Sequence, residues 1–161
     1  MTIGAASATI QPLEYLLSRH MPIRILHIIP SLDLGGAEKQ LALLACGLPR
    51  DQFEVHVCCL ARGGPRQHLL DEAGIPTHVI DKQRKIDPPA YFRLKRHIRD
   101  VQPDIVHTWL FAANAYGRQA ALAAGVKHLV AGERCVDRWK GWRHFFIDRR
   151  LARRTEKRVT N

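Results

Sequence analysis

The sequence of 161 residues contains few cysteines, and it has no long apolar run. Its four cysteines include the adjacent pair Cys58 and Cys59 but no Cys-x-x-Cys pair, so we expect neither a zinc site nor a disulfide framework. No stretch approaches the roughly eighteen apolar residues of a membrane-spanning helix, and the N-terminus lacks a basic segment followed by an apolar one. We therefore expect a cytoplasmic protein with reduced, buried thiols.

Two glycine fingerprints and the usual hydrolytic constellations are also missing. The sequence contains neither Gly-x-Gly-x-x-Gly nor Gly-Lys-Ser/Thr, and no acidic residue stands at Leu60-Ala-Arg62, where a dinucleotide-binding domain contacts the ribose. These absences disfavour a Rossmann-type oxidoreductase. No paired carboxylates, Ser/His/Asp set or ligand spacing among the histidines stands out, so we predict no metal site, no cofactor and no hydrolase chemistry. The sequence also has no internal repeat.

Acidic residues are scarce relative to basic ones. The formal net charge is +10, and residues 134–158 hold ten Lys or Arg against three acidic residues. Such a surplus suits nucleic acid, an anionic membrane or a phosphorylated small molecule, and charge alone does not decide among them. Tryptophans and phenylalanines alternate with the basic residues of this segment, but an amphipathic helix explains that pattern as well as a nucleic-acid surface does. Nucleic acid is the disfavoured partner.

The apolar pattern that is present predicts an α/β fold. Short apolar runs alternate with segments of helical spacing, which is typical of a Rossmann-like, doubly wound parallel sheet with helices on both faces. We assign residues 1–21 to an N-terminal extension, partly helical, and residues 22–161 to a single domain. The predicted strands are 24–29, 54–60, 77–80, 104–109, 127–131 and the start of one at 159–161, and the predicted helices are 37–48, 67–73, 88–101 and 111–124.

The turn at Gly35 and Gly36 joins the first predicted strand to the first helix. That helix has a predicted apolar face of Ala37, Leu41, Leu44, Ala45 and Leu48, and it opens with the polar side chains of Glu38, Lys39 and Gln40. Glycine there would let the backbone turn sharply and would leave the first helical N–H groups open to an anion such as a phosphate. An equally good interpretation is a plain tight connection, with those groups capped by Ser31 or Asp33. Glu38 adds a negative charge near the helix start, which opposes an anion unless its side chain points away.

Other chemically capable residues follow later strands. Ligands of open parallel sheets bind beyond the carboxyl ends of the strands. His107 and Trp109 end the fourth predicted strand and Arg134 follows the fifth, so we expect them at the edge that carries Gly35 and Gly36. For His107 alone, a structural hydrogen-bonding role is the more common one. Arg134 could bind a phosphate or form a local salt bridge.

Three segments together resemble a known family. They are Ile25-Leu-His-Ile-Ile-Pro-Ser-Leu, then Gly35-Gly-Ala-Glu-Lys-Gln-Leu, then Pro103-Asp-Ile-Val-His107. In this order they resemble the N-terminal half of a GT-B glycosyltransferase of the family 4 type, over about residues 23–161.

The resemblance implies two Rossmann-like domains facing a cleft, the first for the acceptor and the second for the nucleotide-sugar donor. It implies retention of configuration, no metal, and a sugar or lipid-linked acceptor. By the same resemblance, Gly35 and Gly36 face the donor diphosphate, and His107 lies by the transferred sugar as the catalytic residue. Trp109, Arg134 and Glu38 are candidates to line the cleft because we expect them at the same sheet edge. The donor domain does not follow within these 161 residues, so we expect this chain alone to be inactive.

A second hypothesis comes from the charge. In it the chain is a non-catalytic module whose basic helices dock on an anionic membrane or on nucleic acid. The basic face of the predicted helix at 88–101 carries this hypothesis, although a solvated face explains the same residues more simply.

Overall fold

The computed structural model describes residues 21–133 and 157–160. The described part forms one six-stranded parallel sheet in the order β3-β2-β1-β4-β5-β6. Its strands are β1 (Ile23–Ile29), β2 (Phe53–Cys59), β3 (Thr77–Val79), β4 (Ile105–Trp109), β5 (His128–Glu133) and β6 (Lys157–Thr160), and its helices are α2 (Gly36–Gly47), α3 (Gln67–Glu72), α4 (Pro88–Val101) and α5 (Leu110–Ala124).

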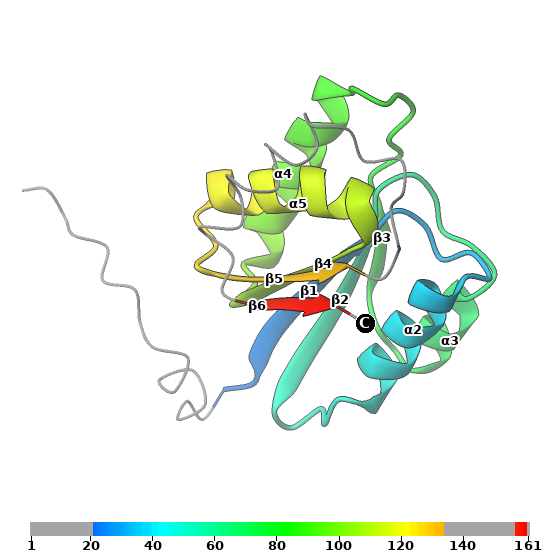
Figure 1. The fold of residues 1–161 in the computed structure, drawn as a ribbon. Coiled ribbons are helices and arrows are strands. Elements are labelled where there is room, and N and C mark those ends of the chain that lie inside the picture. The colour runs from blue at the N-terminus through cyan, green and yellow to red at the C-terminus, as the bar shows by residue number, and fades with distance from the viewer. Residues whose placement is uncertain (1–20, 134–156, 161) are drawn as a thin grey trace, which may run out of the picture.

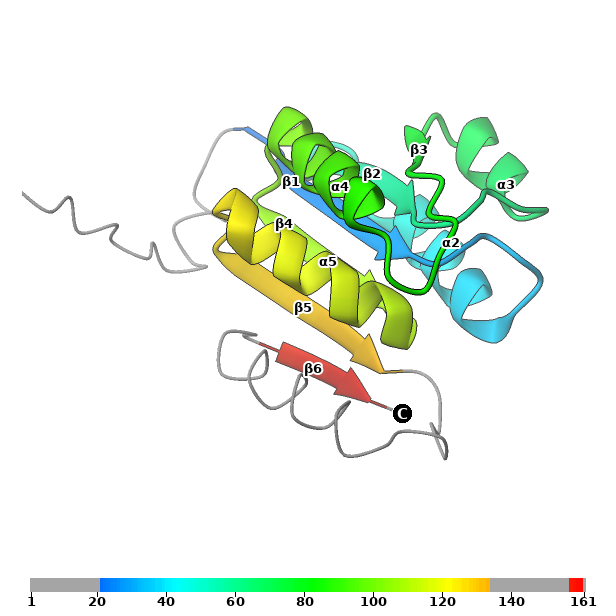
Figure 2. The ribbon, with the colours of Figure 1, turned by 90° about the horizontal axis from the view of Figure 1, so that it is seen from above.

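Helices cover both faces of the sheet (Figure 1). Helices α4 and α5 lie on one face, and α2 and α3 lie on the other, over the half of the sheet that contains β1, β2 and β3 (Figure 2). Strand β1 is buried along almost its whole length, as a central strand of an α/β sheet must be. The predicted doubly wound parallel sheet is therefore confirmed.

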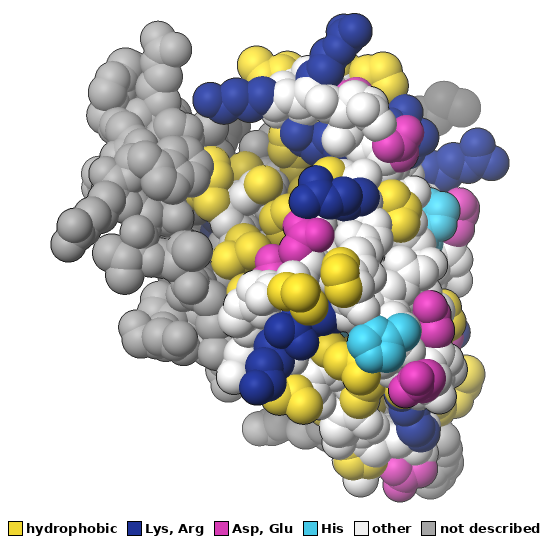
Figure 3. Space-filling view, turned by 90° about the vertical axis from the view of Figure 1, so that its right-hand side faces the viewer, with side chains coloured by type: hydrophobic (Ala, Val, Ile, Leu, Met, Phe, Trp, Pro, Cys, Tyr) yellow, Lys and Arg dark blue, Asp and Glu magenta, His cyan; other side chains and the backbone are white. Residues whose placement is uncertain are grey.

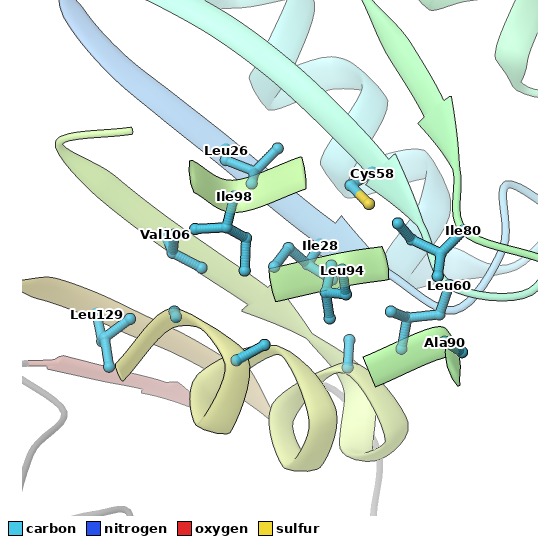
Figure 4. Close-up of a cluster of buried hydrophobic side chains, with 13 residues drawn as sticks. Leu26, Ile28, Cys58, Leu60, Ile80, Ala90, Leu94, Ile98, Val106 and Leu129 are labelled. Carbon is cyan, nitrogen blue, oxygen red and sulfur yellow. The ribbon is translucent and has the colours of Figure 1, made fainter. Parts of the chain in front are cut away.

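The core has two main clusters, one on each side of the sheet, and a small third cluster around Ile23 and Ile25 of β1. Figure 4 shows the cluster beneath α4 and α5, where Leu26, Ile28 and Val106 of the sheet meet Leu94 and Ile98 of α4. Gly117 brings α5 close to the sheet, because a Cβ atom there would lie only 2.7 Å from Thr108 Cγ2 and 3.3 Å from Ile28 Cδ1. Close packing of α5 thus depends on a missing side chain.

The predicted helix ends are largely right. Two prolines open α4 behind the N-cap residue Asp87, whose carboxylate accepts a hydrogen bond from Ala90 N at 3.1 Å. Gly125 ends α5 with φ 92°, the left-handed conformation expected of a glycine C-cap. Most strand bounds differ by one or two residues from the prediction, and β5 continues through Gly132 and Glu133, which we had predicted to lie beyond it.

The buried face of α2 was predicted incorrectly. Leu44 was expected in the core but is 40% exposed, whereas Glu38, expected outside, is only 9% exposed. The buried face contains Glu38, Leu41, Ala42 and Ala45, which repeat at three- and four-residue intervals just as the predicted set does. Apolar spacing alone could not distinguish two overlapping faces of the helix.

The strand order reverses direction between β1 and β4. From β1 the chain runs outward through β2 and β3, then returns through α4 to β4 on the other side of β1. The loops that follow β1 and β4 therefore leave in opposite directions and open a crevice at their carboxyl ends. This switch point is where the fold itself places a ligand site.

Candidate functional site

Two histidines stand side by side at the switch point. His27 of β1 and His107 of β4 are register partners, so their side chains share a face of the sheet. Their ring centroids are 5.2 Å apart. His27 is 1% exposed, whereas His107 is only half-buried. His27 was not among the predicted site residues, and only the pairing of the two strands brings it to His107.

Trp109 completes the group and fixes the tautomer of His27. Its ring centroid lies 4.5 Å from that of His107, and its indole Nε1 donates a hydrogen bond of 3.2 Å to His27 Nδ1. Because Nδ1 accepts, the proton of neutral His27 is on Nε2. Burial lowers the pKa of His27 to about 3, and nearby His107 acts in the same direction. His27 is therefore an uncharged neighbour of His107 near neutral pH.

The imidazole of His107 lies close to strand β5. Its Nε2 atom is buried, and a Cβ atom at Gly132 of β5 would lie 3.4 Å from it, an ordinary van der Waals distance. Beneath the site, Thr108 Oγ1 donates to Asn114 Oδ1 at 2.6 Å, and Asn114 Nδ2 donates to Gly132 O at 3.3 Å. These buried bonds tie α5 to the ends of β4 and β5.

The backbone is strained where β4 turns into α5. Leu110 has φ 65°, a left-handed conformation that is costly for a branched residue. It directly follows Trp109, and its side chain packs with the core cluster beneath α2. Strain of this kind persists where the surrounding structure enforces it, and it concentrates at functional sites.

The turn before α2 differs from the predicted one. Gly35 has φ −82° and ψ 171°, and neither it nor Gly36 has a positive φ, so a sharp turn does not require glycine at either position. The need at Gly35 is for space, because a Cβ atom there would lie 2.1 Å from Glu38 Oε2. At Gly36 a Cβ atom would have nothing within 4 Å. The side chain of Glu38 thus folds back over Gly35, whereas the space beside the Cα atom of Gly36 is open.

Among the described residues, no side chain caps the start of α2 with a hydrogen bond. Ser31 and Asp33, which we had considered as caps, bind each other at 2.8 Å instead. Asp33 also accepts a bond of 2.6 Å from Arg62 Nη2, and Leu32 N donates to Gly63 O at 3.2 Å. The loop after β1 is therefore held by the loop after β2. Arg62 was absent from the predicted site, since its role depends on two loops meeting.

The structure places most of the predicted site residues at one edge of the sheet. Trp109 is the last residue of β4 and His107 its middle residue, while Gly35 and Gly36 stand at the start of α2, after β1. Trp109 is 1% exposed, and its ring lies against those of His27 and His107. Arg134 lies outside the described residues.

Residues 21–133 and 157–160 contain neither a candidate metal site nor a candidate membrane-spanning helix. No group of three or more His, Cys, Asp or Glu side chains in this part could hold a metal ion. No helix in the same part is long and apolar enough to cross a membrane.

Comparison with solved structures shows which proteins share this fold. The chain is similar to Alr3699/HepE of Anabaena, solved with UDP and also with UDP and glucose, at 22% identity and TM-score 0.68, covering 86% of this chain and 38% of HepE. MurG of Acinetobacter baumannii gives 19% identity and TM-score 0.62, with 86% and 41% covered. A UDP-GlcNAc 2-epimerase of Neisseria meningitidis is 13% identical, with a TM-score of 0.51, and the match covers 86% of this chain and 40% of the epimerase. The chain thus spans about two fifths of each of these proteins.

Comparison of the sequence itself narrows the assignment to one family. A search of curated proteins finds no match. The sequence model of Glycosyltransferase Family 4 matches residues 34–161, which is most of the chain and includes Gly35, Gly36 and His107. The GT-B fold shared with HepE and MurG agrees with that match. The chain belongs to Glycosyltransferase Family 4.

Proposed function

We propose that residues 22–161 are the acceptor-side half of a retaining glycosyltransferase, which moves a sugar from a nucleotide-sugar donor to a sugar or lipid-linked acceptor. Residues 1–21 are an extension of this half, and a donor-binding domain completes the enzyme. The observation that carries the proposal is the fold's switch point, where the half-buried His107 of β4 pairs with His27 of β1 and where α2 begins after β1. Family membership and the UDP held by HepE support it. The non-catalytic module of our second hypothesis has no support from the comparisons.

In this proposal, residues of the chain position the transferred sugar and stabilise the leaving diphosphate. The N–H groups at the start of α2 face the donor diphosphate as it leaves, and the space that a Cβ atom of Gly36 would occupy has no atom within 4 Å. His107 offers an imidazole to the transferred sugar, and the pair formed by His27 and Trp109 holds that imidazole in place. Glu38 and Trp109 belong to the same cleft, as does Arg134. We propose that the reaction needs no metal and takes place in the cytoplasm.

One half of such an enzyme should not catalyse transfer. The reaction requires two substrates to be positioned together and the leaving diphosphate to be stabilised, and each domain supplies only part of this. We expect the 161-residue chain to show no sugar transfer and no nucleotide-sugar hydrolysis, whereas the same chain followed by its donor domain should transfer sugar. A transfer assay with both proteins and a panel of nucleotide sugars measures the difference.

Two results would contradict this proposal. Transfer or hydrolysis by the isolated chain that disappears in His107→Ala would show that this half is a complete catalyst. If the reading frame contains no second α/β domain after Asn161, the acceptor-side assignment also fails.

A further inference from the structure

We propose that the outer face of α2 and the end of α3 dock on the same surface of a second copy of this chain, with the two α2 helices antiparallel. The surface consists of Lys39, Leu43, Leu44, Asp51 and Glu72, and we call it the α2 surface. It goes beyond the proposed function and does not rest on it, because none of these side chains belongs to the candidate site.

Two neighbouring leucines of α2 are exposed to solvent. Leu43 is 59% exposed, and Leu44 is 40% exposed. The helix packs on the sheet through Leu41, Ala42 and Ala45 instead, and neither exposed leucine belongs to a core cluster of the described residues. A single exposed leucine is common in proteins, whereas two on one turn of a helix begin an apolar patch that a partner can cover.

The end of α2 is joined to the end of α3, so the α2 surface is ordered before it meets a partner. Arg50 Nη2 donates a hydrogen bond of 3.2 Å to Ala73 O, and Cys46 Sγ donates to Leu69 O at 3.6 Å. Buried Leu70 of α3 lies in the same core cluster as the inner face of α2. Little backbone entropy is therefore lost when this surface docks.

The charge of this part of the chain differs from that of the whole. Residues 36–76 contain four Lys or Arg against five Asp or Glu, although the formal net charge of the chain is +10. Figure 3 looks onto the end of the molecule toward which the strands run, and acidic and basic side chains mix over its lower part, at the height of α2 and α3 in Figure 1. A second copy can thus approach the α2 surface without the repulsion that the basic parts of the chain would impose.

Within the α2 surface the two signs of charge lie at opposite ends. Exposed Lys39 is in the first turn of α2, whereas exposed Asp51 follows the end of α2 and exposed Glu72 is the last residue of α3. Arg50 lies at this second end too, but Asp51, Asp71 and Glu72 outnumber it. The last turn of α3, which is fully described, carries no basic residue, and acidic side chains are unfavourable at that end of a helix. A basic group brought by a partner would relieve them.

These features favour an antiparallel pairing of two copies. A two-fold axis across α2 places Leu43 and Leu44 of one copy against the same residues of the other. The same axis brings Lys39 of each copy toward the acidic end of the other, so opposite charges face each other twice. A parallel pairing would bring like charges together at both ends.

Other occupants fit the α2 surface less well. The donor domain of the proposed enzyme would lie across the carboxyl edge of the sheet, where α2 begins, whereas both exposed leucines are in the second half of that helix. Nucleic acid or another anionic surface would be repelled by Asp51 and Glu72. A second copy supplies both the leucines and the charge of each sign that the surface lacks a partner for.

Sedimentation velocity of the 161-residue chain tests this inference without any sugar transfer. Over a range of micromolar concentrations we expect the average mass to rise reversibly from that of one chain toward that of two. Leu43→Ser with Leu44→Ser should weaken the association about tenfold or more, because the apolar contact is lost from both copies.

Charge reversal tests the antiparallel arrangement. A chain with Lys39→Glu, and a different chain with Asp51→Lys and Glu72→Lys, should each self-associate about tenfold more weakly, since like charges then meet at both ends. An equimolar mixture of these two chains should associate as tightly as the unchanged chain, because every facing pair of charges is again of opposite sign.

The matched control lies on α4. Phe92 is 65% exposed and the side chain of Arg96 is 85% exposed, so Phe92→Ser with Arg96→Glu makes comparable changes away from the α2 surface. It should self-associate as the unchanged chain does, and circular dichroism checks that each variant is folded. A chain that stays monomeric at every concentration overturns the inference. Association that the leucine variant leaves unchanged, or a mixture of the two charge variants that stays dissociated, also overturns it.

Discussion

The free energy of unfolding should fall steadily as the pH is lowered from 6.5, at about 1.4 kcal/mol per pH unit for His27 alone. The pKa of His27 is about 3 in the folded chain because the ring is buried, against 6.5 as its ordinary value. Between these values the unfolded chain binds the proton and the folded chain does not, so acid favours unfolding. The contribution of His27 to the free energy of unfolding is fully present above pH 6.5, and about 4 kcal/mol of it is lost by pH 3.5.

A second histidine adds to this slope. His97 of α4 stacks on His78 at 4.2 Å, and burial lowers its pKa to about 4 with help from His78 and His56, while Asp100 opposes the change. Its contribution has the same sign and is lost between pH 6.5 and 4. Because His97 is partly exposed, solvent reduces its effect below that of His27.

Urea unfolding at several pH values between 6.5 and 5 measures this effect above the range of ordinary carboxyl titration. His27→Gln should flatten the slope, since the amide oxygen can still accept from Trp109 Nε1 but does not titrate. The unchanged chain, unfolded in the same series, gives the slope for comparison. If His27→Gln keeps the full slope, His27 is not buried and neutral as described.

Gly117→Ala should destabilise the protein by about 1–3 kcal/mol, although alanine is the better helix former. The added methyl group would lie 2.7 Å from Thr108 Cγ2, and Thr108 is fully buried and bonded to Asn114. Either α5 moves off the sheet or Thr108 gives up its position. Both responses disturb the segment that carries His107 and Trp109.

Replacing Gly47 by alanine should raise the free energy of unfolding, the opposite of the effect at Gly117. Gly47 is the last residue of α2, is exposed, and would place a Cβ atom with nothing within 4 Å. Gly47→Ala should therefore stabilise by up to about 1 kcal/mol. Chemical denaturation of both variants gives the comparison. Equal effects of the two substitutions would mean that α5 does not pack on the sheet as closely as described.

Much of this fold could be predicted from the sequence, because strands buried on both faces leave continuous apolar runs. Arg24 to Ile29 is such a run, and prolines and glycines mark the helix ends that follow. Contacts between neighbouring strands could not be predicted in this way. That His27 touches His107 depends on β1 and β4 being neighbours in register, which no local pattern specifies.

Predictions about the glycine turn show where such reasoning fails. Gly35 was expected to serve an unusual backbone angle, but its backbone is ordinary and its lack of a side chain makes room for Glu38. Side chains that fold back on a loop leave no periodic signal. The same holds for Arg62, which reaches Asp33 across two loops. The positions of the site residues were predictable, and their contacts were not.

The central claim is that the carboxyl edge at β1 and β4 faces the donor in the complete enzyme. Hydrogen–deuterium exchange of that enzyme tests it, with and without whichever of UDP, GDP or ADP saturates it. We predict slower exchange at residues 35–38 and 107–110 on nucleotide binding, with residues 43–47 of α2 unchanged. Protection confined to the donor domain, with these two segments exchanging at their free rates, would contradict the account.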